Sequence, residues 1–229
     1  QRAYDQIIND LCINNSNALI LVYRASIYGN KDMTHLGFND ISMLGNMPNL
    51  MYLAPTTVEE LESSIRYGLE HHNHPIAIRI PVGVPINDTA QFNTIDNPVT
   101  SYDITQSGNT IAIIGVGNFY HKAVELSHAI RETTHMSPTI VKPLCISSLD
   151  TDTLNELTKD HHIVITLEDG ELEGGYGQKI ASYYGKTSMK VLNYGISKQF
   201  YDRYKPEDVL QQNHLDFEHI LDDIRNVQY

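Results

Sequence analysis

The sequence has no tryptophan and only two cysteines among its 229 residues. Cys12 and Cys145 lie far apart and form no CxxC pair, so the sequence offers neither a disulfide framework nor a cysteine-based metal motif. Because such a chain suits a reducing compartment, we expect a cytoplasmic protein. No apolar run approaches the roughly 20 residues of a membrane-spanning helix, so we expect no membrane association.

Basic residues are also scarce, because 16 Lys and Arg stand against 28 Asp and Glu, giving a formal charge of −12. This balance argues against nucleic acid as a partner, since phosphate backbones select basic surfaces. It does not exclude a small phosphorylated substrate, because a few Arg and Lys side chains in one cleft can bind an anion on an acidic protein.

The composition is that of a globular protein, with 41% apolar and 19% charged residues. A chain of this length can form one large domain or two ordinary ones. Its first residues, Gln1 to Ile8, already follow a helix-like pattern without an initial methionine or a signal peptide. We therefore expect a truncated, processed or partial protein.

Strand and helix patterns alternate along the chain, which predicts parallel sheets with helices on their faces. The apolar run 18–23 is typical of a strand buried on both faces. In the first half we expect strands at 18–23, 50–53 and 75–80, with helices at 3–11, 39–45 and 56–71.

The second half repeats the alternation after a segment rich in Pro, Asn, Asp and Thr. We expect strands at 110–114, 139–143, 162–167 and 189–194, with helices at 119–131, 151–157, 175–184, 207–213 and 217–227. The predicted organisation is two three-layer α/β domains, residues 1–82 and 108–229, joined by a linker at 83–107 that carries short edge strands at most.

The loop that follows the first strand concentrates reactive side chains. Arg24, Lys31, Asp32 and His35 lie within a dozen residues, and in a parallel sheet ligands bind beyond the carboxyl ends of the strands. Arginine can bind phosphate in a bidentate manner, aspartate can accept hydrogen bonds from hydroxyls, and histidine exchanges a proton near neutral pH. The chemistry alone also allows an exposed polar loop with a satisfied histidine.

Longer motifs along the chain make the interpretation of this loop more specific. Those in the first half are Gln1-Arg2-Ala3-Tyr4-Asp5-Gln6, the loop from Arg24 to Gly37, Asn46-Met47-Pro48-Asn49-Leu50, Leu53-Ala54-Pro55-Thr56 and Ile78-Arg79-Ile80-Pro81. Those in the second half are Val141-Lys142-Pro143-Leu144, Thr166-Leu167-Glu168-Asp169 and Gly174-Gly175-Tyr176-Gly177. In order and spacing, nearly the whole chain resembles the C-terminal portion of the 1-deoxy-D-xylulose-5-phosphate synthases, which are transketolase-like thiamine-diphosphate enzymes.

The resemblance implies a partial transketolase pyrimidine-binding domain followed by a transketolase C-terminal domain. It implies a transferase of isoprenoid and thiamine biosynthesis that condenses pyruvate with glyceraldehyde 3-phosphate. His35 falls on the family's proton-transferring histidine in its Thr-His-x-Gly motif, and Arg24 falls on an arginine that contacts the phosphate of the acceptor. Lys31 and Asp32 lie around the same acceptor.

Two positions depart from the family pattern. Where the family has Arg-Tyr-Pro-Arg-Gly, this chain has Arg79-Ile80-Pro81-Val82-Gly83, so Val82 removes one phosphate ligand. Lys31 occupies the position of an acceptor-binding aspartate, with Asp32 beside it. Either Lys31 and Asp32 compensate for these changes, or the acceptor differs.

The family's site for Mg²⁺ and the cofactor diphosphate, a Gly-Asp-Gly motif with a later Asn, lies in a preceding domain that these residues do not include. We therefore expect thiamine diphosphate and Mg²⁺ in the complete enzyme, a homodimer there, and no cofactor-binding, metal-binding or synthase activity in this chain alone. Two alternatives stay open: a transketolase-like or 2-oxoacid dehydrogenase β-type subunit that needs a partner chain, and a diverged non-catalytic assembly module.

Three weaker motifs have plainer interpretations. Gly115-Val116-Gly117-Asn118 superficially suggests a dinucleotide loop, but a strand-to-helix turn explains it. His71-His72-Asn73-His74 is more typical of a helix end than of a metal site. For Glu168-Asp169-Gly170-Glu171 and the nearby glycines we prefer a structural role, close helix packing near a dimer interface, over acid–base catalysis.

Overall fold

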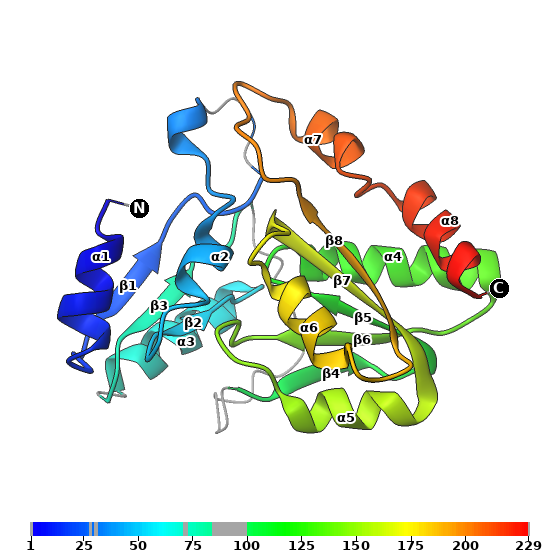
Figure 1. The fold of residues 1–229 in the computed structure, drawn as a ribbon, viewed down its shortest axis with the longest axis horizontal. Helices are drawn as coiled ribbons and strands as arrows, with labels where there is room; N and C mark the ends of the chain where they lie inside the picture. The colour runs from blue at the N-terminus through cyan, green and yellow to red at the C-terminus, as the bar shows by residue number, and fades with distance from the viewer. Residues whose placement is uncertain (1, 28, 30–31, 71–72, 84–99, 229) are drawn as a thin grey trace.

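The computed structural model describes residues 2–27, 29, 32–70, 73–83 and 100–228. It contains two α/β units whose sheets lie side by side, a three-stranded one at the left and a five-stranded one at the right of the view (Figure 1). The prediction of two α/β domains with parallel-rich sheets is therefore confirmed. Within the described residues, no helix is long and apolar enough to cross a membrane.

The first unit is an all-parallel sheet with strand order β1-β3-β2. Its strands are β1 (Leu19–Val22), β2 (Met51–Leu53) and β3 (Ile76–Arg79). Its helices are α1 (Tyr4–Gln6), the π-helix η1 (Ile7–Cys12), the 3-10 helix η2 (Met33–His35), α2 (Asp40–Leu44) and α3 (Val58–Glu70). The predicted first helix is thus mainly a π-helix, in which the Ile13 amide donates to the Ile8 carbonyl, five residues earlier.

Helix α3 begins with a pair of hydrogen bonds related to a capping box. The Thr57 hydroxyl accepts from the Glu60 amide at 3.2 Å, and the Glu60 carboxylate accepts from the Thr56 amide at 2.7 Å. This exchange satisfies amides that the first turn of a helix leaves without an intrahelical partner. The carboxylate reaches one residue further back than in the standard capping box.

The prediction that the run 18–23 is buried on both faces is wrong. All four residues of β1 are half-buried or exposed, and Leu21 is 38% exposed. The physical reason is position: β1 is an edge strand of the described sheet and pairs only with β3. β3, the central strand, is buried at every residue.

The second unit is a five-stranded sheet with order β4-β6-β5-β7-β8, in which only β4 is antiparallel. Its strands are β4 (Tyr102–Gln106), β5 (Thr110–Gly115), β6 (Thr139–Pro143), β7 (His161–Glu171) and β8 (Lys190–Ile196). Its helices are α4 (Phe119–Thr134), α5 (Thr151–Asp160), α6 (Tyr176–Tyr184), α7 (Pro206–Gln212) and α8 (Phe217–Gln228).

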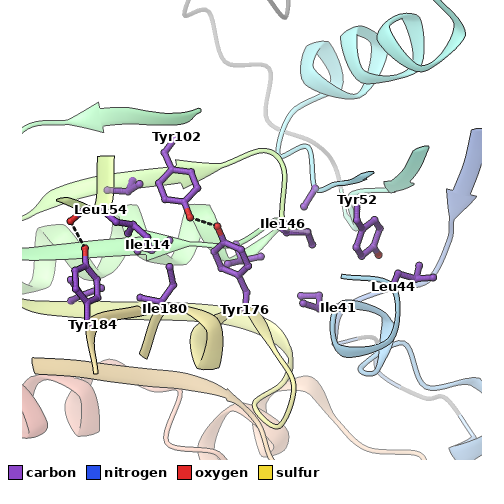
Figure 2. Packing of buried hydrophobic residues seen from close by; sticks show 14 of the residues in the cluster. Ile41, Leu44, Tyr52, Tyr102, Ile114, Ile146, Leu154, Tyr176, Ile180 and Tyr184 are labelled. Atoms are coloured by element: carbon purple, nitrogen blue, oxygen red, sulfur yellow. Dashed lines mark hydrogen bonds between the residues drawn. The ribbon is translucent and has the colours of Figure 1, made fainter. Parts of the chain in front are cut away.

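Strand β5 shows how alternation in the sequence creates three layers. Ile111 and Ile113 belong to a buried cluster with α4 and α8, whereas Ala112 and Ile114 belong to a second cluster with α5 and α6. Side chains alternate between the two faces of a strand, so one apolar run supplies both layers of core. Figure 2 shows the second layer. There the hydroxyls of Tyr102 and Tyr176 form a hydrogen bond, and the Tyr184 hydroxyl donates to the Leu154 carbonyl at 2.8 Å.

The segment predicted as a linker contributes to this sheet. Residues 84–99 lie outside the described part of the chain, but β4 at 102–106 forms the antiparallel edge of the second sheet. It is an edge strand of the kind expected within 83–107.

The two units share one core. Ile41, Leu44 and Tyr52 of the first unit lie in the same buried cluster as Ile114 and Tyr176 of the second (Figure 2). Backbone hydrogen bonds also cross between the units, from the Ala54 amide to Leu144 and from the Ile146 amide to Tyr52, each at 2.8 Å. This shared core fixes the loops of one unit against the strand ends of the other.

Candidate functional site

The loop after β1 is closed at its base by a short antiparallel bridge. The Ser26 amide donates to the Gly37 carbonyl at 3.1 Å. A Cβ on Gly37 would lie 1.9 Å from the Arg24 carbonyl oxygen, so only glycine allows this approach. Arg24 and Ser26 have φ angles of +61° and +87°, which L-residues rarely adopt and which cluster at functional sites.

The loop presents three of the four predicted site residues, and all three are exposed. Asp32 precedes η2 and His35 ends it, and the His35 amide donates to the Asp32 carbonyl at 2.8 Å. The Thr34 hydroxyl lies 2.9 Å from Nδ1 of His35. Among the described residues, no hydrogen bond or ion pair joins the Arg24 side chain to Asp32 or His35, and Lys31 lies outside the described residues.

A segment of the second unit forms one side of this loop, which the sequence did not indicate. The ring of Phe38, just after the loop, lies 5.4 Å from Tyr201 and 5.6 Å from Tyr204 between centroids. In Figure 1 the chain leading into α7 runs close to η2 at the top of the view. The Arg203 Nε donates to an Asp32 carboxylate oxygen at 3.2 Å, across 171 positions of sequence.

Behind the loop lies a buried charge cluster. Arg79, at the end of β3, is 2% exposed and pairs with Asp40 at 2.6 Å and with Asp169. Burial alone would lower the pKa of Arg79, but the two carboxylates raise it well above its ordinary value, so the group stays charged. The Tyr52 hydroxyl donates to Asp40 at 2.5 Å, which further satisfies that carboxylate. The one sequence signal that could have indicated this cluster is Arg79 itself, a charged residue at the end of the otherwise apolar strand β3.

The cluster also fixes the chain near Val82. Asn118 donates from its amide nitrogen to Asp169 at 3.2 Å and accepts from the Val82 amide at 3.0 Å. Gly117, with φ +54°, lets the turn approach Arg79, since a Cβ there would lie 3.0 Å from the guanidinium. The motif at 115–118 is thus a strand-to-helix turn between β5 and α4.

Glu168 lies inside β7, which continues to Glu171 and not only to residue 167 as the pattern predicted. Its carboxylate accepts from the amides of Tyr176 and Gly177, at the start of α6, at 2.9 and 2.8 Å. Burial raises the pKa of Glu168 to about 7, against the lowering effect of these two amides. A Cβ on Gly175 would lie 2.6 Å from this carboxylate, so the glycine makes the contact possible.

The histidine-rich motif at 71–74, which the sequence favours as a helix end, lies only partly within the described residues. In that part of the chain, no group of three or more His, Cys, Asp or Glu side chains is placed to hold a metal ion. His71 and His72 lie outside it, and His74 borders a small pocket beside Cys145. The described residues therefore offer no ligand set for Mg²⁺.

A groove of about 690 Å³ lies away from the loop, between the units. It is bordered by the turn 45–48, the segment 147–149 and the first two turns of α6. Lys179 spans it and donates to the Gly45 carbonyl at 2.5 Å. Arg24, Asp32 and His35, the predicted site residues that the structure describes, do not border this groove, so it does not belong to the loop site.

The fold is that of a two-domain α/β protein in which the loop 24–37 follows the carboxyl end of a strand of a parallel sheet and contacts the neighbouring domain. Comparison with family models assigns both parts. Residues 1–84 match the transketolase pyrimidine-binding domain and residues 101–220 match the transketolase C-terminal domain. The chain belongs to the transketolase family, whose members use thiamine diphosphate.

The chain is similar to 1-deoxy-D-xylulose-5-phosphate synthases over nearly its whole length. It is 32% identical to that of Clostridium tetani and 31% identical to that of Gloeothece citriformis, in each case over 98% of this chain and 36% of the relative. It therefore spans little more than a third of these curated relatives. Among solved structures it is similar in fold to a chain described as a split gene transketolase in an inactive β4 tetramer, with a TM-score of 0.82, 18% identity and coverage of 98% of this chain and 71% of that one.

Proposed function

We propose that this chain is the C-terminal portion of a thiamine-diphosphate-dependent synthase that condenses pyruvate with glyceraldehyde 3-phosphate to 1-deoxy-D-xylulose 5-phosphate. The observation that carries the proposal is the loop 24–37, closed by the Ser26–Gly37 bridge, which presents Arg24, Asp32 and His35 to solvent at the end of a parallel strand. The similarity of about 31% to such synthases over nearly the whole chain supports the same assignment.

Each exposed side chain has a role that suits its chemistry. The Arg24 guanidinium binds the phosphate of the acceptor in a bidentate manner. Asp32 accepts hydrogen bonds from acceptor hydroxyls. His35 gives a proton to the acceptor carbonyl oxygen as the new carbon–carbon bond forms, and its contact with Thr34 orients the ring.

The cofactor machinery belongs to the domain that these residues do not include. When bound in the complete enzyme, thiamine diphosphate would supply the nucleophilic carbon that reacts with pyruvate. Because the resemblance places the Mg²⁺ and diphosphate motif in a preceding domain, we expect the 229-residue chain alone to bind the cofactor weakly and to lack synthase activity. Tight calorimetric binding of thiamine diphosphate to the isolated chain would contradict this. We further propose that the complete enzyme is a homodimer in the cytoplasm.

Replacement of His35 in the complete enzyme tests the proposed function. His35→Ala should lower turnover of pyruvate with glyceraldehyde 3-phosphate by roughly 10²- to 10⁴-fold, the usual contribution of a general acid. His128→Ala, at an exposed position on α4, is the matched control and should leave turnover unchanged. Equal kinetics for the two variants would remove His35 from the mechanism.

A substitution at position 82 tests whether the acceptor carries a phosphate. Adding the missing arginine as Val82→Arg should lower KM for glyceraldehyde 3-phosphate by roughly tenfold or more, because a charge-assisted hydrogen bond contributes about 1.5–3 kcal/mol. An unchanged KM would mean that another cation already binds the phosphate, or that the acceptor carries no phosphate.

A second candidate is a transketolase-like or 2-oxoacid dehydrogenase β-type subunit whose cofactor-diphosphate domain is a separate chain. Two observations support this second candidate. The chain covers only about a third of the synthases, and it shares its fold with a split gene transketolase. Reading the gene upstream of Gln1 separates the two. A contiguous Gly-Asp-Gly domain supports the synthase, whereas a separate gene for that domain supports the two-chain enzyme.

A further inference from the structure

The segment between β8 and α7 brings positive charge to the loop site of an acidic protein. Residues 198–205 contain Lys198, Arg203 and Lys205 against one acidic residue, Asp202, whereas the whole chain has a charge of −12. This local excess lies where the second unit packs on the loop, because Asp32 pairs with Arg203 there. The segment is therefore suited to attract an anion toward the loop.

The backbone that carries Arg203 is held firmly. Tyr201 and Tyr204, on either side of it, are 6% and 9% exposed, and their rings lie 5.8 Å apart between centroids. Arg203 itself has a φ of +45°, a conformation that persists only where the surrounding structure imposes it. The loop also approaches this segment closely at Gly29, where an added Cβ would lie 2.9 Å from Pro206. The guanidinium is thus presented from a fixed point.

Most N–H donors of the Arg203 guanidinium are available to a ligand. Arg203 is 77% exposed, and in the described part of the chain its only hydrogen bond runs from Nε to Asp32. Arginine carries five N–H donors in a planar fork, so both terminal nitrogens remain able to bind a phosphate in a bidentate manner. An ion pair this exposed contributes little stability, so an anionic ligand can compete with Asp32 at little cost.

We infer that Arg203, supplied by the C-terminal domain, binds the anionic group of the acceptor substrate at the loop that carries Arg24, Asp32 and His35. The inference rests on the proposed function in taking the loop to be the acceptor site and the anion to be the phosphate of the acceptor. It makes the segment 201–206 a wall of the substrate site and Arg203 a determinant of specificity for phosphorylated over neutral acceptors.

Ligand binding to the complete protein tests this without any turnover. Glycerol 3-phosphate should bind in preference to glycerol in calorimetric titrations, and Arg203→Gln should weaken its binding by roughly ten- to a hundredfold, as expected for one charge-assisted contact. Arg203→Lys, which keeps the charge and loses the fork, should recover part of the affinity.

Arg225→Gln is the matched control. Arg225 is also exposed and also pairs with an aspartate, Asp222 at 2.7 Å, but it lies on α8 at the opposite end of the second unit from the loop (Figure 1). It should leave glycerol 3-phosphate binding unchanged, and both glutamine variants should keep the wild-type melting temperature. Equal affinity in the Arg203→Gln and Arg225→Gln proteins, or no preference of the wild type for glycerol 3-phosphate over glycerol, would overturn the inference.

Kinetics separate this inference from the proposed function. In an active enzyme, Arg203→Gln should raise KM for glyceraldehyde 3-phosphate and leave kcat/KM for unphosphorylated glyceraldehyde unchanged; a KM for glyceraldehyde 3-phosphate that does not rise counts against Arg203. A protein that binds glycerol 3-phosphate through Arg203 but does not decarboxylate pyruvate would contradict the proposed function and uphold the role of Arg203.

Discussion

At the scale of single residues, Arg79 carries the largest electrostatic consequence. It is 2% exposed, and its two partners, Asp40 and Asp169, are 7% and 0% exposed. One cation thus balances two buried carboxylates that come from different units. Removing one partner of such a cluster leaves uncompensated charge in a medium of low polarity, which is far more costly than losing an exposed pair.

Arg79→Met should therefore lower the free energy of unfolding by roughly 3–5 kcal/mol. Urea denaturation at constant pH measures this. Arg225→Gln, which breaks an exposed pair, should change it by about 1 kcal/mol or less. The triple variant that combines Arg79→Met with Asp40→Asn and Asp169→Asn should recover much of the lost free energy of unfolding. A small effect of Arg79→Met alone would show that the carboxylates find other partners.

Glu168 makes the stability of the folded protein decrease as the pH rises. Its pKa is about 7 in the folded protein, above the ordinary value of 4.5. The folded state therefore binds more protons than the unfolded state between these values. Stability from this group is fully present below pH 4.5 and is lost as the pH rises to about 7.

Glu168→Gln should remove that contribution. From pH 4.5 to 7, the free energy of unfolding should fall less steeply in the variant than in the wild type, by up to roughly 1 kcal/mol per pH unit. Urea titrations at several pH values measure the difference between the two profiles. Glu173→Gln, at an exposed position nearby, should leave the profile unchanged. Parallel profiles for wild type and Glu168→Gln would contradict the assignment.

At the scale of elements, the loop 24–37 depends on one close approach of backbone to backbone. Gly37 lies against the Arg24 carbonyl so tightly that a methyl group cannot fit, and the bridge to Ser26 requires that approach. The positions of Arg24 and His35 at the two ends of the loop therefore depend on a residue with no side chain.

Gly37→Ala should open the base of the loop while the two sheets stay folded. Trypsin should then cleave after Arg24 several times faster than in the wild type, because local opening exposes the backbone to the protease. Circular dichroism should remain that of the folded protein. Gly185→Ala is the control, since its added methyl would meet neighbours only at 3.4 Å or beyond. Equal cleavage rates in the two variants would show that the bridge does not hold the loop.

At the scale of the whole molecule, the two units are joined by a common core. Tyr52 and Leu44 share a cluster with Ile114 and Tyr176, and the buried ion pair between Lys142 and Glu60, 2.5 Å long, connects β6 to α3. Part of the apolar surface of each unit is buried only by the other, so local unfolding of one unit exposes this shared core of the other.

The chain should accordingly unfold in a single cooperative transition in spite of its two sheets. Calorimetry should give a van't Hoff enthalpy equal to the calorimetric enthalpy, the mark of two-state behaviour. Two resolved transitions would mean that the units are independent domains joined by a weak interface.

The sequence by itself determined seven of the eight described strands and the parallel-rich character of both sheets, because these depend on local patterns of apolar residues. Apolar runs and the spacing of Arg24, Asp32 and His35 along one loop are visible within short windows. The extent of β7 past residue 167 and the half-exposure of β1 were not predictable in this way. The first depends on pairing with a strand from a later segment, and the second on a place at the edge of the sheet.

Only the tertiary structure decided what surrounds the loop. Arg203 meets Asp32 across 171 positions, and Arg79 meets Asp169 across 90. Neither pairing follows from a local pattern, since charge partners at such separation are chosen by how the two units dock. The loop therefore gains a cation, Arg203, from a distant segment, and the buried cluster behind it joins Arg79 to a carboxylate of the second unit; both depend on how the two units pack.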